Sequence, residues 1–498
     1  MPSEMISEIV SRVLILAQWA TLIYFLTINS FYVLLLAAAC WELWKHNSQA
    51  QQSSMLRLLG SKVAPSISVL APAFNEAATI TDSVKGLLAL YYPNLEIIVI
   101  NDGSSDATLE ILIQEFDLEP IENVYQRRQD ALQTKAVVGR YRSRNHPNFV
   151  VVDKVNGGKA DALNAGLNQA SGQLVCAVDA DTLIEPDAMQ RMVRPFLARD
   201  DVLAAGGTIR VANGCTVRGG RVVATPVPHH FLAGFQVLEY LRAFLFGRLG
   251  WNRLGGNLVI SGAFGLFRSE AVVDIGGYAH DAIGEDMELI MRLRTRSYER
   301  KVCHRVEFIP DPVAWTQVPE SLRALGGQRD RWHRGLAEVL WRYRRALLNP
   351  RYGALGMVVF PYFLFVELLA PAVEALGLLV IIAGFALGIV NLPFASLFLL
   401  VAYGYGLILT ASTLVMEEVN YHRHDGFKDR LLLVTWAIIL ENFGYCQLTV
   451  FWRLKGLVRF VLGRTDWGAI ERQRFNSPEA QPDTANLKNT PVHAPAWA

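Results

Sequence analysis

The amino-acid sequence predicts two structural parts: an α/β domain built on a mainly parallel sheet, and an α-helical bundle that spans a membrane. Between about residues 66 and 320, short apolar runs alternate with helical stretches, which is the pattern of strands joined by crossover helices. On both sides of this region lie apolar stretches long enough to cross the roughly 30 Å hydrocarbon layer of a bilayer. Of the 498 residues, 52% are apolar and only 19% are charged, which argues against a purely soluble protein.

Charge and cysteine content exclude several classes of protein. The chain has 47 Lys and Arg against 46 Asp and Glu, a formal net charge of +1. It therefore lacks the basic field that nucleic-acid binding requires, and no nucleic-acid partner is expected. The five cysteines are scattered and never in CxxC spacing, so neither a disulfide framework nor a structural zinc site is expected.

The first apolar stretch, residues 13–41, carries no charged side chain and is predicted to be a transmembrane anchor. It is longer than the apolar region of a signal peptide and shows no cleavage site, so we expect it to stay uncleaved. Basic residues follow it, Lys45 first among them. By the positive-inside rule, residues 1–12 lie outside the cell, and the linker 42–65 and the domain beyond it lie in the cytoplasm.

Four apolar runs predict the strands of the sheet: residues 66–73, 95–100, 149–153 and 173–178. Each ends in polar or acidic residues, and the carboxyl ends of parallel strands meet at one edge, where such sheets bind ligands. The polar residues at these ends are Asn75 and Glu76, then Asn101, Asp102 and Asp106, then Asp153, and last Asp179 and Asp181.

A cluster of carboxylates at one edge of the sheet indicates a bound divalent cation. Any single acid at a strand end is equally explained by a helix cap or a turn, but four strands ending in this way are not. Oxygen ligands alone favour Mg²⁺ or Mn²⁺ over zinc. Such an ion suits a ligand with a diphosphate, whose charge it neutralises.

The segment 156–167, NGGKADALNAGL, supplies a candidate phosphate site. Gly157 and Gly158 let the backbone approach a ligand closely, and Lys159 offers a positive charge. The segment has neither the GxxxxGK[ST] nor the GxGxxG spacing, so it predicts neither a P-loop nor a dinucleotide-binding fold.

The sequence GED at 284–286 supplies a candidate general base. If a helix begins here, Asp286 lies in its first turn, where a positioned and partly buried carboxylate is able to remove a proton from a hydroxyl group. The alternative is an acid that merely stabilises the helix N-terminus.

Residues 321–350 are predicted to form an amphipathic helix at the membrane interface. Gln328, Arg331, Trp332 and Gly335 fall on one face of it, so an amide, a guanidinium and an indole are presented together for a phosphate and a sugar ring. The other face is expected to meet anionic lipid. Its arginines are Arg329, Arg334, Arg342, Arg344 and Arg345.

Residues 351–453 are predicted to form a transmembrane bundle of about four spans, with three crossings or a re-entrant pair as alternatives. Residues 454–498 are expected to form a cytoplasmic tail that is disordered at its end. The four spans lie near 353–370, 372–390, 394–416 and 431–452.

Seven motifs occur in order along the chain: PAFNEA, NDGSSD, NGGKADALNAGL, DAD, SGAFGLFR, GED and QRDRW. Because it carries these motifs, the sequence from about residue 66 to 472 resembles the membrane-embedded family 2 glycosyltransferases. This family includes cellulose, chitin, hyaluronan and poly-N-acetylglucosamine synthases. The resemblance implies a GT-A fold that binds a nucleotide sugar, a UDP-activated donor, and inversion at the anomeric carbon. Two positions depart from the family pattern: Asn101 replaces an Asp, and Gln317 stands where relatives commonly carry Glu.

The resemblance also implies a role for each motif residue. Asp286 would be the base toward the acceptor hydroxyl, and Asp181, together with Asp179, would hold Mg²⁺ or Mn²⁺. Asn75, Glu76 and Asp102 would bind uridine, and Lys159 and Asp179 would bind the nucleotide sugar. Gln328, Arg331 and Trp332 would bind the diphosphate and the acceptor. Ser261, Gly262 and Ala263 would line the acceptor site, and Glu285, beside the base, would also bind substrate.

The expected function is processive transfer from a UDP-sugar, first UDP-N-acetylglucosamine and second UDP-glucose, into a β-linked exopolysaccharide that crosses the membrane. The expected partners are the donor, the growing polysaccharide, the bilayer, and export or accessory subunits. The expected location is the inner (plasma) membrane, with several spans and the catalytic domain in the cytoplasm.

Two alternatives remain open: transfer of one sugar to a polyprenyl phosphate, and a transporter or scaffold with a vestigial sugar-binding domain. Three acids in the apolar spans, Glu367, Glu374 and Glu441, are expected to face protein or water. Glu367 and Glu374, seven residues apart, are expected either to pair with arginines of the interface helix or to line a path for the sugar chain.

Overall fold

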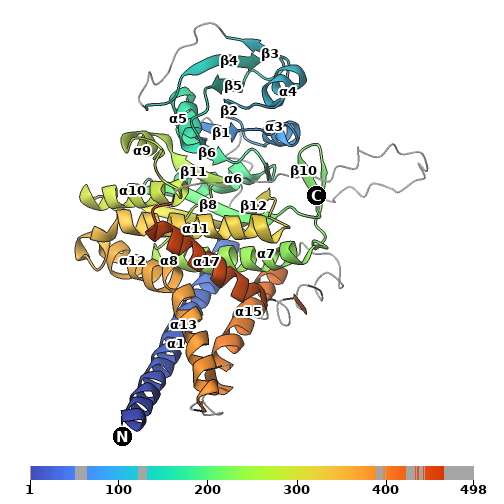
Figure 1. The fold of residues 1–498 in the computed structure, drawn as a ribbon. Coiled ribbons are helices and arrows are strands. Elements are labelled where there is room, and N and C mark those ends of the chain that lie inside the picture. Colours follow the sequence, from blue (N-terminus) through green and yellow to red (C-terminus); the bar gives the residue numbers. More distant parts are fainter. Residues whose placement is uncertain are drawn as a thin grey trace, which may run out of the picture.

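The computed structural model places a sheet domain on top of a group of helices, with a layer of helices between them (Figure 1). The predicted linker and the end of the predicted tail lie largely outside the described residues, and so does part of the fourth predicted span. The structure describes residues 2–50, 64–121, 132–388, 396–398, 400–421, 432, 435–436, 441 and 444–464.

The centre of the upper domain is a ten-stranded sheet with the strand order β3-β4-β5-β2-β1-β6-β11-β8-β12-β7. A separate two-stranded hairpin, β9 (Thr216–Arg218) and β10 (Arg221–Ala224), stands beside it. The strands of the large sheet are β1 (Ile67–Ala73), β2 (Leu95–Asp102), β3 (Leu118–Pro120), β4 (Val137–Ser143), β5 (Phe149–Lys154), β6 (Leu174–Val178), β7 (Thr182–Ile184), β8 (Val202–Val211), β11 (Phe264–Arg268) and β12 (Arg305–Thr316).

The four strands predicted from sequence are β1, β2, β5 and β6, and they pair in parallel as expected. The sheet as a whole is mixed, so the prediction of a mainly parallel sheet was wrong. The decisive strand is β11, which inserts between β6 and β8 and runs antiparallel to both. Its first residue, Phe264, lies opposite Val178, the last residue of β6. The antiparallel direction therefore brings the residues before β11 next to those after β6.

Helices cover both faces of the sheet because the strands are apolar on both faces. Along β2, Ile97 and Val99 pack into one core with α3, α4 and α6, whereas Ile98 and Ile100 pack into a second core with α5 and α10. This alternation is the two-residue period of a strand. The helices of this domain are α3 (Ile80–Leu88), α4 (Thr108–Glu115), α5 (Lys159–Gln169), α6 (Ala188–Ala198), α9 (Ser269–Asp274) and α10 (Glu285–Glu299).

A layer of helices, here called the interface layer, separates the sheet domain from the helices below it (Figure 1). The interface layer consists of α7 (Phe231–Leu241), the π-helical turn η1 (Arg242–Arg248), α8 (Leu249–Leu254), α11 (Leu322–Arg342) and α17 (Cys446–Val461). Below it extend three longer helices, α1 (Pro2–Ala50), α13 (Ala370–Ala386) and α15 (Tyr405–Tyr421). The remaining helical elements are short: η2 (Arg344–Ala346), η3 (Pro350–Tyr352), η4 (Leu355–Val359), α12 (Phe360–Tyr362), η5 (Phe363–Leu368) and η6 (Leu400–Gly404).

Within the described residues, one helical segment, Glu8–Ser48 of α1, is long and apolar enough to cross a membrane. The number rises to two if Leu355–Leu368 and Ala370–Ala386, which are bent by 44° at the break between them, are counted as a single span. The predicted number of spans stays a prediction. Cys446, which lies in the fourth predicted span, begins α17, and this helix packs beside α11 (Figure 1).

The bend before α13 has a local cause. Pro371 has no N–H group, so the carbonyl oxygen of Glu367, four residues earlier, lacks its helical partner. Arg453 of α17 donates to this oxygen at 2.5 Å, and Nε2 of His333 on α11 lies 3.1 Å from the next carbonyl oxygen, that of Leu368. Two helices of the interface layer thus satisfy the carbonyl groups that the bend exposes.

The helix predicted at residues 321–350 is α11, but two of the arginines expected to meet lipid are buried instead. Arg329 pairs with Glu239 of α7, and Arg334 pairs with Asp330 and donates to the carbonyl oxygen of Arg464. The prediction was wrong for these two because α11 is covered on several sides, and a buried guanidinium needs a carboxylate partner. Arg344 and Arg345, beyond the end of α11, are exposed.

Candidate active site

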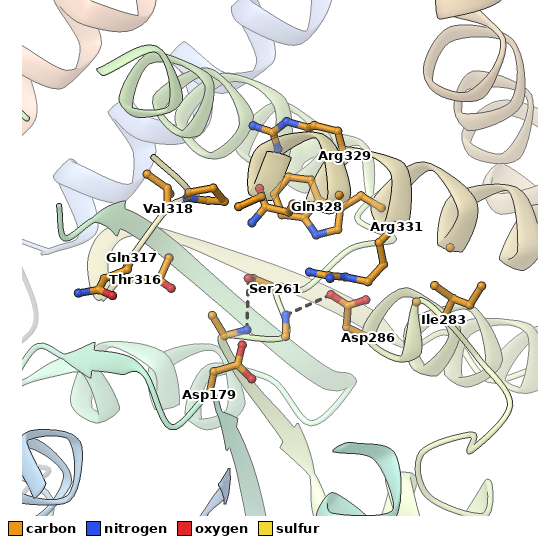
Figure 2. A pocket seen from close by; sticks show the side chains of 18 of the residues that line it. Asp179, Ser261, Ile283, Asp286, Thr316, Gln317, Val318, Gln328, Arg329 and Arg331 are labelled. Carbon is orange, nitrogen blue, oxygen red and sulfur yellow. Dashed lines mark hydrogen bonds between the residues drawn. The ribbon is translucent and has the colours of Figure 1, made fainter. Parts of the chain in front are cut away.

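A cavity of about 1560 Å³ opens where the carboxyl ends of the central strands face the interface layer. It is lined from the sheet side by the strand ends and from the other side by α7, η1 and α11 (Figure 2). Of the catalytic, substrate-binding and metal-holding residues that the family resemblance implies, all except Asn75 line this cavity. They are Glu76, Asp102, Lys159, Asp179, Asp181, Ser261, Gly262, Ala263, Glu285, Asp286, Gln328, Arg331 and Trp332.

Lys159 is the central cation of the cavity floor. It is the first residue of α5, and its Nζ atom lies 2.6 Å from Asp179 Oδ1 and 3.5 Å from Glu285 Oε1. Burial alone would lower the pKa of Lys159, but Asp179 and Glu285 outweigh it and raise the pKa. The ammonium group therefore stays charged at neutral pH.

Asp179 and Asp181 follow β6 and provide the carboxylates predicted to hold a metal. Burial, and after it the charge of Asp179, raise the pKa of Asp181 to about 6. The described residues contain no group of three or more His, Cys, Asp or Glu arranged to hold an ion. Two neighbouring carboxylates that repel each other nevertheless fit a hard divalent cation, whose charge would relieve this repulsion.

Asp286 lies in the first turn of α10, close to the loop that precedes β11. Its Oδ2 atom accepts a hydrogen bond from the backbone N–H of Gly262 at 3.1 Å (Figure 2). A β-carbon at Gly262 would lie 2.9 Å from the Nζ atom of Lys159, so a larger residue there would displace the ammonium group. Burial raises the pKa of the neighbouring Glu285, and Lys159 acts against this. The antiparallel strand β11 thus holds Asp286, the predicted base, next to Lys159.

The glycine loop after β5 is held by Asp102 and does not point its amides toward a ligand. The backbone N–H groups of Gly157 and Gly158 donate to the Asp102 carboxylate at 3.0 and 2.8 Å. Gly158 nevertheless lines the cavity, and the expectation that these two glycines let the backbone approach a phosphate stays a prediction. Gly157 is required for packing, because a β-carbon there would lie 2.5 Å from Asp161.

Lys154, which sequence reasoning missed, anchors this arrangement. Its side chain is fully buried, and its Nζ atom lies 2.6 Å from Asp102 Oδ1 and 2.5 Å from Asp161 Oδ1. Lys154 is the last residue of β5, and Asp161 is in the first turn of α5. One buried cation therefore joins the end of β2, the end of β5 and the start of the helix that carries Lys159.

Other acids and amides at the strand ends have structural roles. Asn75 has a φ of 57°, and its Oδ1 atom accepts from the backbone N–H of Ser105 at 2.8 Å. Asp106 accepts from the backbone N–H groups of Ala77 and Thr108. Asp153 accepts from Nδ2 of Asn101 at 2.7 Å. These contacts fix the loops behind the cavity.

The stripe on α11 faces the cavity as predicted. Figure 2 shows Gln328 and Arg331 projecting from α11 toward the loop with Ser261 and the start of α10 with Asp286. Burial lowers the pKa of Arg331. Trp332 is 48% exposed, and the buried guanidinium of Arg329 lies 4.6 Å from the centroid of its ring. An indole supported in this way offers a flat surface to a sugar ring.

The fourth member of the stripe, Gly335, permits the close contact between α11 and α10. A β-carbon at Gly335 would lie 3.1 Å from the backbone nitrogen of Gly284, the residue before α10. The two glycines therefore let α11 and the start of α10 approach each other.

A further wall of the cavity, from α7 and η1, was not recognised from the sequence. Its lining residues are Glu239, Tyr240, Arg242, Ala243, Phe244 and Arg248. Glu239 accepts from Arg329 and, at 2.8 Å, from the hydroxyl of Tyr445. The available signal was the occurrence of charged residues within an otherwise apolar stretch, because a charge placed among apolar neighbours needs a partner or a ligand.

Of the three acids predicted in the apolar spans, Glu367 and Glu441 are paired with arginines, although not with those of α11. Glu441 forms an ion pair with Arg242 of η1, which also donates to the hydroxyl of Thr410 at 2.8 Å. Glu367 lies 3.8 Å from Arg453 of α17 and accepts from the hydroxyl of Tyr362 at 3.0 Å. Both Glu367 and Arg453 also line the cavity.

Comparison with known proteins agrees with this geometry. Residues 174–415 match the family described as "Glycosyl transferase family group 2", and residues 68–131 match "Glycosyl transferase family 2". Poly-beta-1,6-N-acetyl-D-glucosamine synthases of Staphylococcus aureus (strain COL) and Staphylococcus epidermidis are 33% and 34% identical over 277 residues, 55% of this chain. The chain spans 56% of the length of these relatives.

A solved structure shares the fold. It is a mannosyltransferase from Pyrobaculum calidifontis in complex with GDP-Man and Mn²⁺, with a TM-score of 0.50 and 18% identity, covering 88% of this chain and 99% of the other. The sheet domain thus has a GT-A fold with a mixed sheet. With both family matches in order along the chain and the family's motif residues in one cavity, the protein carries family 2 glycosyltransferase domains.

Proposed function

We propose that this protein is an inverting, processive glycosyltransferase that polymerises a UDP-sugar, with UDP-N-acetylglucosamine as the first choice and UDP-glucose as the second, into a β-linked polysaccharide. The observation that carries the proposal is that Lys159, Asp179, Asp181 and Asp286 line the same cavity as the stripe on α11. The names of the similar synthases from the two Staphylococcus species support N-acetylglucosamine as the sugar.

Each of these cavity residues has a separate role in the proposed reaction. The carboxylate of Asp286 takes the proton of the acceptor hydroxyl, whose oxygen forms a bond to C1 of the donor sugar. The bond between C1 and the diphosphate oxygen breaks, and UDP departs on the opposite side, which inverts the anomeric centre. Lys159 and Arg331 stabilise the negative charge that develops on the departing UDP.

Asp179 and Asp181 would hold Mg²⁺ or Mn²⁺ in this mechanism. A divalent cation supplies charge neutralisation of the diphosphate when bound. Lys159 shares Asp179 with that site, since the two are 2.6 Å apart, and so keeps a positive charge beside the same phosphate groups.

The extent of the cavity supports a polymer as the acceptor. From the catalytic floor it continues to residues of α17 and of the bent helix pair. This part is lined by Phe363, Glu367, Thr449, Trp452, Arg453 and Lys455. A mixture of aromatic, hydroxyl and charged groups suits a hydrated sugar chain, which has apolar ring faces and polar edges. We infer that the product leaves toward the helices below the interface layer.

A membrane location follows from the surface of α1. Leu16 and Leu34 are 68% and 64% exposed, and water is an unfavourable surrounding for such a row of apolar side chains. We infer that α1 and the helices beside it lie in the plasma membrane as a multi-pass bundle, with the sheet domain on the cytoplasmic side. Export or accessory subunits would then meet the product beyond the membrane.

The test is to offer the purified protein, with Mg²⁺ or Mn²⁺, a panel of UDP-sugars and to measure UDP release and product size. We expect UDP-N-acetylglucosamine to give the fastest release and a size-distributed polymer. A single sugar on a polyprenyl phosphate would refute the polymerase and support the alternative. Asp286→Asn should abolish release, whereas Asp274→Asn, an exposed acid on α9, should not. Equal loss in both variants, or no release from any donor, would refute the catalytic role of the cavity.

A further inference from the structure

Arg248, the last residue of η1, presents unused hydrogen-bond donors to the cavity. Its guanidinium lies over the ring of Phe244, with 4.2 Å from the guanidinium carbon to the ring centroid. Stacking on an aromatic ring fixes the plane of the guanidinium. Within the part of the chain that the structure describes, Arg248 makes neither a hydrogen bond nor an ion pair. Its five N–H donors are therefore free to meet a ligand.

Other arginines near this wall do not share this property. Arg242, one and a half turns earlier, is paired with Glu441, and Arg329 on the facing helix is paired with Glu239. Burial lowers the pKa of Arg248 to about 10, and the charge of Asp286 acts against this, so the side chain is cationic at neutral pH. A cation held in a cavity without a carboxylate partner is expected to bind an oxygen-rich ligand.

The position of Arg248 indicates which part of the substrate this ligand is. Phe246 of η1 and Met287, the residue after Asp286, are buried in the same hydrophobic core, so the turn that carries Arg248 lies beside the start of α10 and both side chains line the cavity. The donor diphosphate lies on the side of Asp179, where Lys159 already serves it. The space beside Asp286 that remains belongs to the acceptor.

We propose that Arg248 binds the acceptor saccharide, donating hydrogen bonds to hydroxyl or acetamido oxygens of its terminal sugar so that the attacking hydroxyl faces Asp286. This inference rests on the proposed function, because it assumes a saccharide acceptor. The π-helical turn that carries Arg248 supports it, since such turns are frequent at functional sites.

The test compares Arg248→Met and Arg248→Lys with Arg253→Met. Arg253 lies on α8, is exposed and does not line the cavity, so it controls for the loss of an arginine from the same region. Three quantities are measured on the full-length protein: the Kd of UDP, UDP release to water without acceptor, and the KM of a short β-linked N-acetylglucosamine oligosaccharide.

We expect Arg248→Met to raise the KM of the oligosaccharide by about 10- to 100-fold, which is about 1.4 to 2.7 kcal/mol at 1.36 kcal/mol per factor of ten. Arg248→Lys should lie between Met and the wild type because it keeps the charge but not the fork of donors. The Kd of UDP and the release of UDP to water should stay within about twofold of wild type, the variation normal for a change outside the contact. Arg253→Met should leave all three unchanged.

Two results would overturn the inference. A UDP Kd that weakens as much as the oligosaccharide KM would assign Arg248 to the diphosphate. An oligosaccharide KM that stays at the wild-type value would show that Arg248 does not contact the acceptor. If Arg248→Met does not fold, Arg248→Lys carries the same comparison. Absence of UDP release by the wild-type protein would instead refute the proposed function, and this is seen before any variant is compared.

Discussion

Replacing Lys154 by Met tests how strongly the donor side of the site depends on one buried cation. The Nζ atom of Lys154 lies within 2.6 Å of both Asp102 and Asp161, and none of its side chain is exposed. Met keeps the length of the side chain but leaves two buried carboxylates without their common partner. Removal of one partner from a buried ion pair costs about 3–5 kcal/mol. Because a domain is stable by only about 5–15 kcal/mol, we expect a large loss of stability and weaker UDP binding in Lys154→Met.

Two further variants separate burial from charge in this experiment. Lys85 lies 2.6 Å from Glu115, but its side chain is 45% exposed, so Lys85→Met should cost less than about 1 kcal/mol. Lys154→Met combined with Asp161→Asn removes one carboxylate as well and should recover part of the loss. Urea unfolding followed by tryptophan fluorescence gives the free energies, and calorimetry gives the Kd of UDP. Equal losses for the two single lysine variants, or no recovery in the double variant, would refute the reasoning.

Three other outcomes follow from the site. Asp286→Asn should lower kcat by about 10²- to 10⁴-fold, the usual contribution of a general base, while calorimetry shows unchanged UDP binding; weakened UDP binding would contradict its assignment to the acceptor side. Gly157→Ala should weaken UDP binding, because the added β-carbon would lie 2.5 Å from Asp161. Gly406→Ala should leave UDP binding unchanged, because no atom lies within 4 Å of the added β-carbon. Equal UDP affinities in the two variants would contradict this prediction. EDTA should stop UDP release, and added Mg²⁺ or Mn²⁺ should restore it in the wild type but not in Asp181→Asn. Full activity in EDTA would show that the reaction does not need a divalent cation.

The central strands and most site residues were predictable because their signals are local. An apolar run that ends in an acid predicts a buried strand with a polar end, and parallel pairing then brings several such ends together. This reasoning placed Asp102, Asp179 and Asp181 in one cavity. Asn75 does not line this cavity, and an Asn in a turn looks the same in sequence whether it binds a ligand or its neighbour Ser105, so its role in binding uridine stays a prediction.

The parts that were not predicted depend on contacts between distant segments. The direction of β11 is set by its partners β6 and β8, which no local pattern reveals. The burial of Arg329 depends on Glu239, which lies on another helix. Lys154 was missed for the same reason, since its two partners come from two other elements. A charged residue within an apolar stretch of sequence is the one local pattern that indicates such a buried ion pair.

The interface layer links the acceptor side of the cavity to the bend in the helix pair below it. His333 follows Trp332 on α11, and it contacts the carbonyl oxygen of Leu368 at the bend. Burial, and after it Arg453, lower the pKa of His333 to about 3, so the ring is neutral at physiological pH and Nε2 carries the proton that this contact needs. Because Arg453 binds the preceding carbonyl oxygen and also lines the cavity, a change in the bend would move side chains on the path we propose for the product. Sugar transfer and product movement would then share one set of contacts.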